Sequence, residues 1–135
     1  MKKLAIVCAS LSRGGAERVT VCLADYMNRH GIQTTIITDK QGENEYPIPN
    51  DVERICLVDK RINKVKGLIT KIARMRAAVK EKQIDTVLIM GISHCIYAIP
   101  GCIGTKAKIV VSERNDPKHF KGKRVVKFAA MLLMK

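Results

Sequence analysis

Short apolar runs alternate along this chain with longer segments whose apolar residues recur every three or four positions. The run Leu4–Ala9 has no polar interruption, as is typical of a strand buried on both faces in a parallel sheet. Four further runs have the length and the β-branched or alternating composition of strands: Gln33–Thr38, Val52–Val58, Asp85–Met90 and Lys108–Ser112. The pattern therefore predicts five strands.

Helical periodicity fills most of the segments between these runs. The first helix is predicted to end before Gly31, and its apolar face consists of Val19, Cys22, Leu23, Tyr26 and Met27. The second is predicted over Lys60–Gln83, and its apolar stripe consists of Ile62, Val65, Ile69, Ile72 and Val79. The remaining predictions are a surface loop over Gln41–Asp51, a short helix broken at Pro100 within Cys95–Gly104, and a terminal helix over Arg124–Met134.

The order of these elements predicts an α/β fold. Parallel strands joined by helices form right-handed βαβ units, and their repetition over residues 1–135 predicts one Rossmann-like, doubly wound parallel sheet flanked by helices. A bilayer-spanning helix over Thr86–Thr105 is a weaker alternative, because Gly91, His94 and Pro100 interrupt this uncharged stretch. A secretion signal is also disfavoured, since the apolar run after Lys3 is shorter than a typical signal core.

The composition fits one globular domain with a strongly basic surface. The 135 residues are 47% hydrophobic and carry a formal net charge of +13, so the surface should attract phosphorylated molecules, anionic lipid or nucleic acid. Five cysteines occur without a CxxC pair. We expect free thiols, mostly buried in the core, in a reducing cytoplasm rather than metal ligands or disulfides.

The most informative stretch is KLAIVCASLSRGGAER at 3–18, in which a strand, a small-residue loop and a helix start follow one another. Such a turn leaves backbone N–H groups free at the positive end of a helix dipole, which favours a bound phosphate. The dinucleotide fingerprint GxGxxG and the P-loop pattern are both absent. We expect Gly14 and Gly15 to contact a phosphate or diphosphate, with a plain tight turn as the alternative. Asp39, after the second strand, is interpreted as a turn residue rather than a ribose ligand.

Polar residues also follow two later strands. His94 comes after the fourth strand, and a polar cluster after the fifth consists of Glu113, Arg114, Asn115 and Asp116. Ligands of open α/β sheets lie outside the carboxyl ends of the strands. These residues and Arg13 are therefore candidates for contact with the hydroxyls or phosphates of a substrate, and the alternatives are a structural histidine and a polar turn closed by Pro117.

The second predicted helix has an unbalanced polar face, on which nine basic residues stand against Glu81 alone. A basic, amphipathic helix fits against anionic lipid headgroups, and the alternatives are a solvated surface and a nucleic-acid contact. Nucleic acid is disfavoured because few aromatic residues are present for stacking on bases. The candidate membrane-facing residues are Lys64, Lys71, Arg74, Lys121, Lys123 and Arg124.

Two segments resemble a known family. The first strand with SRGGAERV, followed by Leu23-Ala24 and by Arg29-His30-Gly31 before TTIIT, resembles the amino-terminal domain of family 4 glycosyltransferases. SERNDP at Ser112–Pro117 is similar to a segment of bacterial members. The resemblance extends over essentially the whole chain, and it implies one half of a GT-B enzyme, in which two Rossmann-like domains face a cleft.

In that family the amino-terminal domain mainly receives the acceptor, and a second domain holds most of the nucleotide-sugar donor. The resemblance implies metal-independent transfer with retention of anomeric configuration, and it brings Gly14 and Gly15 near the donor diphosphate, where backbone donors stabilise developing charge. The second domain and its paired glutamates do not occur in residues 1–135, so we expect the chain alone to be inactive. Many members carry a histidine where this sequence has Glu113, so no catalytic role is transferred to His94.

The leading interpretation is the acceptor-binding half of a hexosyltransferase that builds a bacterial surface polysaccharide or lipid-linked glycan. It is expected in the cytoplasm, at the inner face of the membrane, with no metal or other cofactor. Its expected partners are a nucleotide-sugar donor, a glycan or lipid-linked acceptor, an anionic membrane surface and a donor-binding domain. Two alternatives stay open: a stand-alone, non-catalytic module that binds an anionic glycan or lipid, and a nucleotide-binding domain of a different enzyme.

Overall fold

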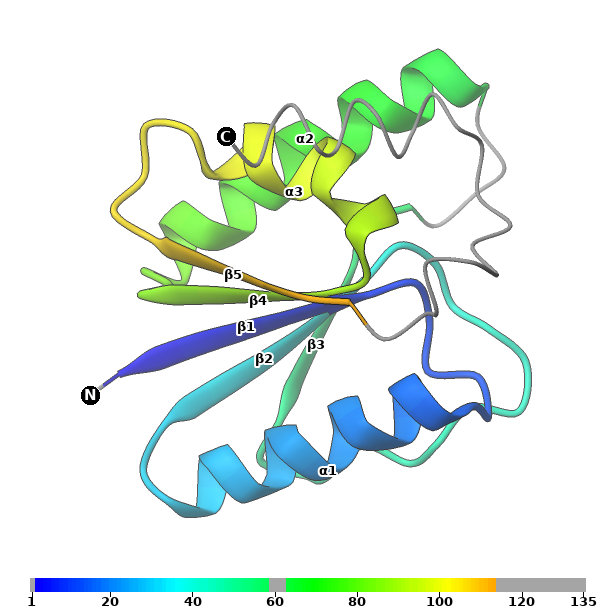
Figure 1. Cartoon of the computed structure of the whole chain (residues 1–135), viewed down its shortest axis with the longest axis vertical. Coiled ribbons are helices and arrows are strands. Elements are labelled where there is room, and N and C mark those ends of the chain that lie inside the picture. Colours follow the sequence, from blue (N-terminus) through cyan, green and yellow to red (C-terminus); the bar gives the residue numbers. More distant parts are fainter. Residues whose placement is uncertain (1, 59–62, 114–135) are drawn as a thin grey trace.

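The computed structural model of the protein describes residues 2–58 and 63–113, which form a five-stranded parallel sheet with helices on both faces (Figure 1). The strands are β1 (Lys3–Cys8), β2 (Gln33–Thr38), β3 (Glu53–Cys56), β4 (Thr86–Met90) and β5 (Lys108–Ser112). The helices are α1 (Gly15–Arg29), α2 (Lys64–Glu81), the 3-10 turn η1 (Ile92–His94) and α3 (Cys95–Cys102). The helix predicted over Arg124–Met134 lies outside the described residues.

The strand order is β3-β2-β1-β4-β5, and every neighbouring pair is parallel. The chain moves outward from β1 to β3 and then crosses through α2 to β4, on the other side of β1. β1 and β4 therefore form the switch point of the sheet, and ligands of such folds bind outside the carboxyl ends of these two strands. The predicted Rossmann-like, doubly wound fold is confirmed.

α1 covers one face of the sheet, below it in Figure 1. The residues that it buries completely are Thr20 and Ala24. Cys22 and Tyr26 were predicted on its apolar face, yet both are exposed, and Tyr26 stacks on His30 with ring centres 4.1 Å apart. That part of the prediction is wrong, because the face turned toward the sheet is centred on Thr20 and Ala24, whereas the predicted Val19, Leu23 and Met27 do pack against the core.

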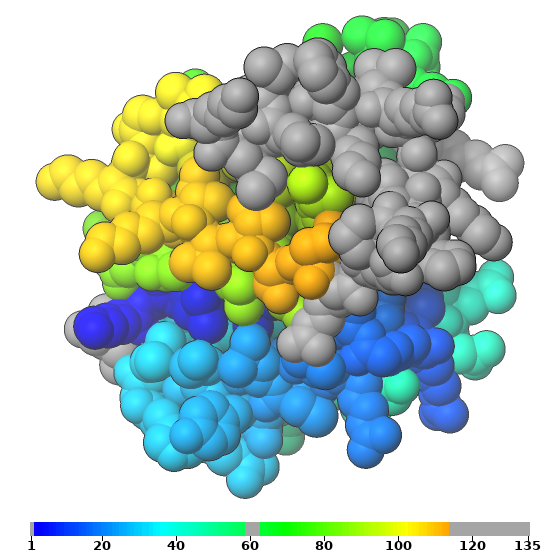
Figure 2. Space-filling view, viewed as in Figure 1, coloured from blue at the N-terminus to red at the C-terminus, as the bar shows by residue number. Residues whose placement is uncertain are grey.

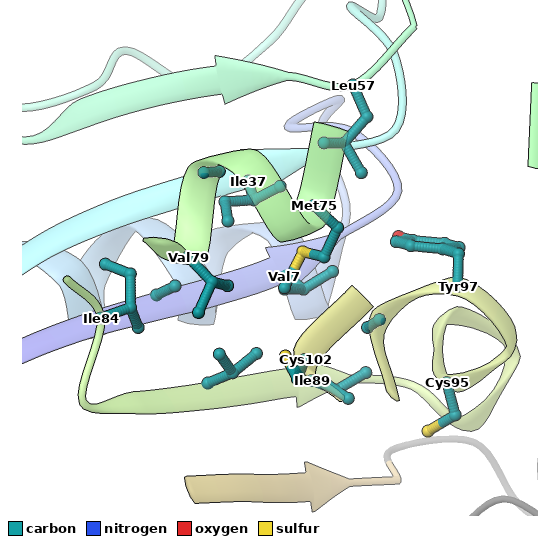
Figure 3. Close-up of a cluster of buried hydrophobic side chains, with 14 residues drawn as sticks. Val7, Ile37, Leu57, Met75, Val79, Ile84, Ile89, Cys95, Tyr97 and Cys102 are labelled. Carbon is teal, nitrogen blue, oxygen red and sulfur yellow. The ribbon is translucent and has the colours of Figure 1, made fainter. Parts of the chain in front are cut away.

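α2 and α3 cover the opposite face and enclose the larger core cluster (Figure 3). Asn63 explains where α2 begins, because its side chain accepts a hydrogen bond of 3.1 Å from the Val65 N–H. Val65 and Ile69 were predicted in the apolar stripe, and they are 67% and 62% exposed. Over these first turns the stripe does not face the sheet, because α2 contacts the core through its later residues, of which Met75 is fully buried.

The uncharged stretch Thr86–Thr105, for which a bilayer-spanning helix was the weaker alternative, contains β4, η1 and α3. The predicted break at Pro100 is wrong, since α3 continues through the proline to Cys102. α3 also approaches α2 closely, as a Cβ on Gly101 would lie 2.7 Å from Met75 Cγ. Within residues 2–58 and 63–113, no helix combines the length and apolar composition needed to cross a bilayer.

All five cysteines are free thiols, as expected. Cys8, Cys95 and Cys102 are buried, and burial raises the pKa of the Cys8 thiol to about 12. Cys22 is exposed.

One edge of the sheet carries apolar side chains at the surface. Figure 2 shows this part of the chain, β5, in orange on the visible face. Ile109 and Val110 are 38% and 49% exposed there.

Candidate functional site

The glycine loop, residues 10–15, connects β1 to α1 at the switch point of the sheet. Gly14 is the N-cap of α1 in an extended conformation, and no side chain caps this turn. The first N–H groups of a helix have no acceptor inside the helix, and the helix dipole adds partial positive charge to them. The loop therefore presents backbone donors at the edge of the sheet where an anion is favoured.

Backbone conformation does not require either glycine of this pair, because neither residue has a positive φ. A Cβ on Gly15 would meet no atom within 4 Å, so open space adjoins this residue. A Cβ on Gly14 would collide with the carboxylate of Glu17, which folds back over the start of α1. Nothing within the described part of the domain therefore requires a glycine at position 15. The close approach of a ligand to the backbone would be a physical reason for it.

A partly buried ion pair holds the glycine loop in place. Glu45 accepts hydrogen bonds from the Leu11 N–H at 3.2 Å and the Gly42 N–H at 2.7 Å, and both of its oxygens are bonded to the Arg54 guanidinium. The two side chains are only 12% and 17% exposed. The hydrogen bond from Arg54 is the largest cause that holds the pKa of Glu45 near 2, below its ordinary 4.5. The predicted surface loop over Gln41–Asp51 is therefore tied to β3 and to the glycine loop.

Asp39, at the end of β2, gathers side chains from α2, η1 and α3. Its carboxylate accepts hydrogen bonds from the Tyr97 hydroxyl and, at 3.1 Å, from Lys71 Nζ. His94 Nδ1 lies 3.9 Å from the same carboxylate. Tyr97 is buried beside Met75 at the rim of the core cluster (Figure 3). Both oxygens of Asp39 have partners within the domain, so the structure does not present this residue to a ribose.

These contacts correct one expectation about the basic helix. Lys71 does not extend from the surface as a membrane-facing residue would, because its ammonium group turns toward Asp39 and lies 5.2 Å from the centre of the Tyr97 ring. Arg74 donates a hydrogen bond of 2.8 Å to the Leu57 carbonyl. Lys64 is exposed in the first turn of α2.

His94 and Glu113 follow the carboxyl ends of β4 and β5. The turn after β4 is made by Gly91, whose φ of +115° favours glycine. Burial lowers the pKa of His94 despite the nearby Asp39 carboxylate, so the imidazole is neutral at pH 7. Glu113 accepts a hydrogen bond of 2.9 Å from the Ile92 N–H, which links the end of β5 to η1.

The remaining candidates from the sequence have different positions. Arg13 is exposed in the glycine loop. Six residues lie outside the described part of the chain: Arg114, Asn115, Asp116, Lys121, Lys123 and Arg124. Among residues 2–58 and 63–113, no group of three or more His, Cys, Asp or Glu side chains is arranged to hold a metal ion.

Sequence reasoning missed the Glu45–Arg54 pair and the partners of Asp39. Two signals were present in the chain: an arginine inside a strand and an aspartate directly after a buried strand, because charged groups in such places need partners. The partners themselves could not be predicted from the sequence, since Glu45 is 9 positions from Arg54 and Tyr97 is 58 positions from Asp39. Only the packing of α3 against the sheet brings the latter two together.

The chain is a Rossmann-like α/β domain with a loop and a helix start at the switch point of its sheet, an arrangement in which many domains bind phosphorylated ligands. Comparison of the sequence with known families specifies the class further. Residues 13–132 match the model of the family described as Glycosyltransferase Family 4. The chain belongs to this family.

Similar proteins agree with this assignment. A curated Campylobacter jejuni relative, a GalNAc-alpha-(1->4)-GalNAc-alpha-(1->3)-diNAcBac-PP-undecaprenol alpha-1,4-N-acetyl-D-galactosaminyltransferase, is 29% identical over 127 residues, which are 91% of this chain and 35% of the relative. The chain thus spans about a third of that relative's length. A glycosyltransferase from Rickettsia africae superposes with a TM-score of 0.63 at 20% identity, over 89% of this chain and 32% of that one. Sucrose-phosphate synthase from Thermosynechococcus elongatus superposes with a TM-score of 0.74 at 9% identity, over 98% and 40%. These two likenesses show a shared fold.

Proposed function

We propose that this domain is the acceptor-binding half of a retaining, nucleotide-sugar-dependent glycosyltransferase that extends a bacterial lipid-linked glycan or surface polysaccharide. The observation that carries the proposal is the Gly14–Gly15 pair at the switch point of the sheet, where no side chain hydrogen-bonds to the N-cap residue and open space adjoins Gly15. Family membership and the lipid-linked substrate named for the Campylobacter jejuni relative support it.

The role proposed for the pair follows from the chemistry of the transfer. An acceptor hydroxyl oxygen bonds to the donor's anomeric carbon as the bond from that carbon to the diphosphate breaks. Negative charge develops on the leaving diphosphate, which can take up the proton that the hydroxyl loses. Backbone N–H groups at the start of α1 would donate charge-assisted hydrogen bonds to that diphosphate. We propose that these donors act without a metal ion, and that a second domain holds the rest of the nucleotide-sugar.

The acceptor would bind along the same edge of the sheet. His94 is neutral at pH 7, so an imidazole nitrogen can accept a hydrogen bond from an acceptor hydroxyl. Arg13 is exposed in the adjacent loop and would attract an acceptor phosphate. Glu113 bonds to η1 and would act by holding the segment that carries His94.

Peripheral binding to an anionic membrane is part of the proposal. The first turns of α2 expose Val65 and Ile69 beside Lys64 and Lys66, and a mixed apolar and basic surface suits the headgroup region. The chain should co-sediment with anionic vesicles and release from them at high salt.

A double variant tests the part that α2 takes in this binding. Val65→Ser with Ile69→Ser should weaken vesicle binding, whereas Ile109→Ser on β5 serves as a matched control for lost apolar surface. Equal retention on neutral and anionic vesicles, or equal effects of both variants, would contradict this part of the proposal.

A transfer assay tests the function as a whole. This chain joined to a donor-binding domain should transfer a sugar from a nucleotide-sugar to a polyprenyl-diphosphate-linked glycan, and the product's anomeric coupling constant should match that of the donor. The chain alone should give no product. Transfer by the isolated chain would contradict the division of labour. Binding of the lipid-linked glycan with no transfer by the joined protein would favour the non-catalytic module.

A further inference from the structure

We infer that Glu45 and Arg54 are positioning residues, which fix the glycine loop in the conformation that lets Gly14 and Gly15 receive a diphosphate. This inference rests on the proposed function and assigns a role to two residues remote from the helix start. Neither residue is expected to touch the ligand. They act through the backbone of the loop.

The bonding of Glu45 carries the inference. One oxygen of its carboxylate accepts hydrogen bonds from two separate segments. The donors are the Leu11 N–H in the glycine loop and the Gly42 N–H in the loop between β2 and β3. The backbone joins the same segments, because the Tyr46 N–H donates to the Leu11 carbonyl at 2.9 Å and Ser12 forms an antiparallel bridge with Glu45. The glycine loop is thus bonded to residues 42–46 on both sides of Leu11.

Arg54 fixes the carboxylate in turn. Its guanidinium donates to both oxygens of Glu45, to Thr38 Oγ1 at 3.1 and 3.2 Å, and to the Lys40 carbonyl at 3.3 Å. It therefore connects β3 and the end of β2 to the residue that holds the glycine loop. No side chain hydrogen-bonds to the N-cap of α1. The loop before Gly14 is therefore held in its path by the bond from the Leu11 N–H to Glu45, which Arg54 supports.

Packing also leaves little room for a different arrangement. A Cβ on Gly42 would collide with Ser12 Oγ, so the connection lies directly against the glycine loop. Ser12 Oγ in turn accepts a hydrogen bond of 3.2 Å from Ser10 Oγ. A change at Glu45 should therefore alter the loop locally before it alters the sheet.

The experiment measures amide hydrogen exchange and 1H–15N NMR spectra of the chain, with inorganic pyrophosphate as the probe. Glu45→Gln keeps an oxygen acceptor but removes the charge, and Arg54→Leu removes the donor. The matched control is Glu53→Gln, next to Arg54 on β3, which breaks an exposed ion pair of 2.7 Å with Lys82 that does not contact the loop.

We expect Glu45→Gln and Arg54→Leu to speed amide exchange at Leu11 and Gly42 by about tenfold, with little change in β1 and β4. Pyrophosphate affinity, read from the shifts of Gly14 and Gly15, should fall by about three- to tenfold. Glu53→Gln should leave both quantities at the wild-type level.

The exchanged pair, Glu45→Arg with Arg54→Glu, separates positioning from charge attraction. It restores opposite charges but offers the Leu11 and Gly42 N–H groups a donor instead of an acceptor, so the loop should remain loose and the affinity low. Full recovery of both readouts in this variant would overturn the inference.

The outcomes distinguish the inference from the proposed function. If wild-type Gly14 and Gly15 do not respond to pyrophosphate, the proposed function fails and the positioning role with it. If they respond equally in wild type and Glu45→Gln, or if exchange rises uniformly through the sheet, the positioning role is wrong while the proposed function stands.

Discussion

Replacing Gly15 with alanine should separate the needs of the fold from those of the ligand. Gly15 is the first residue of α1, it has no positive φ, and a Cβ there would meet no atom within 4 Å. If the glycine serves only the turn, alanine should be harmless in every assay. If it serves a ligand, alanine should improve folding and impair binding.

The expected magnitudes have opposite signs. Alanine is favoured over glycine by up to about 1 kcal/mol inside a helix and by less at its first position, so Gly15→Ala should stabilise the fold by about 0.5 kcal/mol. For a domain of this size that raises Tm by about 2 °C. A methyl group in the ligand's path should remove at least one charge-assisted hydrogen bond, worth about 1.5–3 kcal/mol, which corresponds to a loss of affinity of about tenfold or more.

Thermal unfolding and 31P NMR of inorganic pyrophosphate provide the two measurements. Gly67→Ala is the matched control, because Gly67 also lies in a helix and its Cβ would likewise meet nothing within 4 Å. This control should show a similar gain in stability with unchanged binding. The basic surface adds the same non-specific attraction to both variants, and salt at about 0.15 M limits it. Unchanged pyrophosphate binding by Gly15→Ala, or equal losses in the two variants, would refute the reasoning.

Three further predictions test other parts of the site. The folded state holds the pKa of Glu45 near 2 rather than 4.5, so the stabilisation is fully present above pH 4.5 and is lost as the pH falls toward 2. The shift corresponds to at most about 3 kcal/mol, and urea unfolding across this range should show a smaller loss for Glu45→Gln than for wild type. Tyr97→Phe should cost about 2 kcal/mol and lower Tm by about 7 °C, because the hydrogen bond to the Asp39 carboxylate is lost; an unchanged Tm would show that the bond is dispensable. Glu17→Gln should raise pyrophosphate affinity by about threefold, because it removes a negative charge from the start of α1, and a lower affinity would contradict the placement of the anion there.

Much of the fold was predictable because the spacing of apolar residues and the positions of turn residues agree along the chain. β2 and β5 have the predicted bounds, and β1 and β4 begin or end within one residue of them. Uninterrupted apolar runs identify such strands since both faces are covered. The helix faces were less predictable: Val65 and Ile69 fit a helical stripe by spacing, but the contact between α2 and the sheet begins later in the helix.

The candidate site was predictable only where a backbone motif creates it. The Gly14–Gly15 pair, read as a loop before a helix, stands at the predicted place. Side-chain partnerships were not predictable, because they depend on which elements the fold brings together. Asp39 was interpreted as a turn residue, and Lys71 as part of a lipid-facing surface, yet their charges meet at 3.1 Å.

The most direct test of the central claim is a 1H–15N NMR titration of the chain with a nucleotide-sugar. We predict that the Gly14 and Gly15 amide resonances shift together, and that the affinity is weak, because most of the donor is expected to contact a second domain. Shifts confined to other regions would contradict the assignment of the glycine loop to the donor diphosphate. Nanomolar affinity of the isolated chain would equally show that the loop belongs to a different kind of nucleotide site.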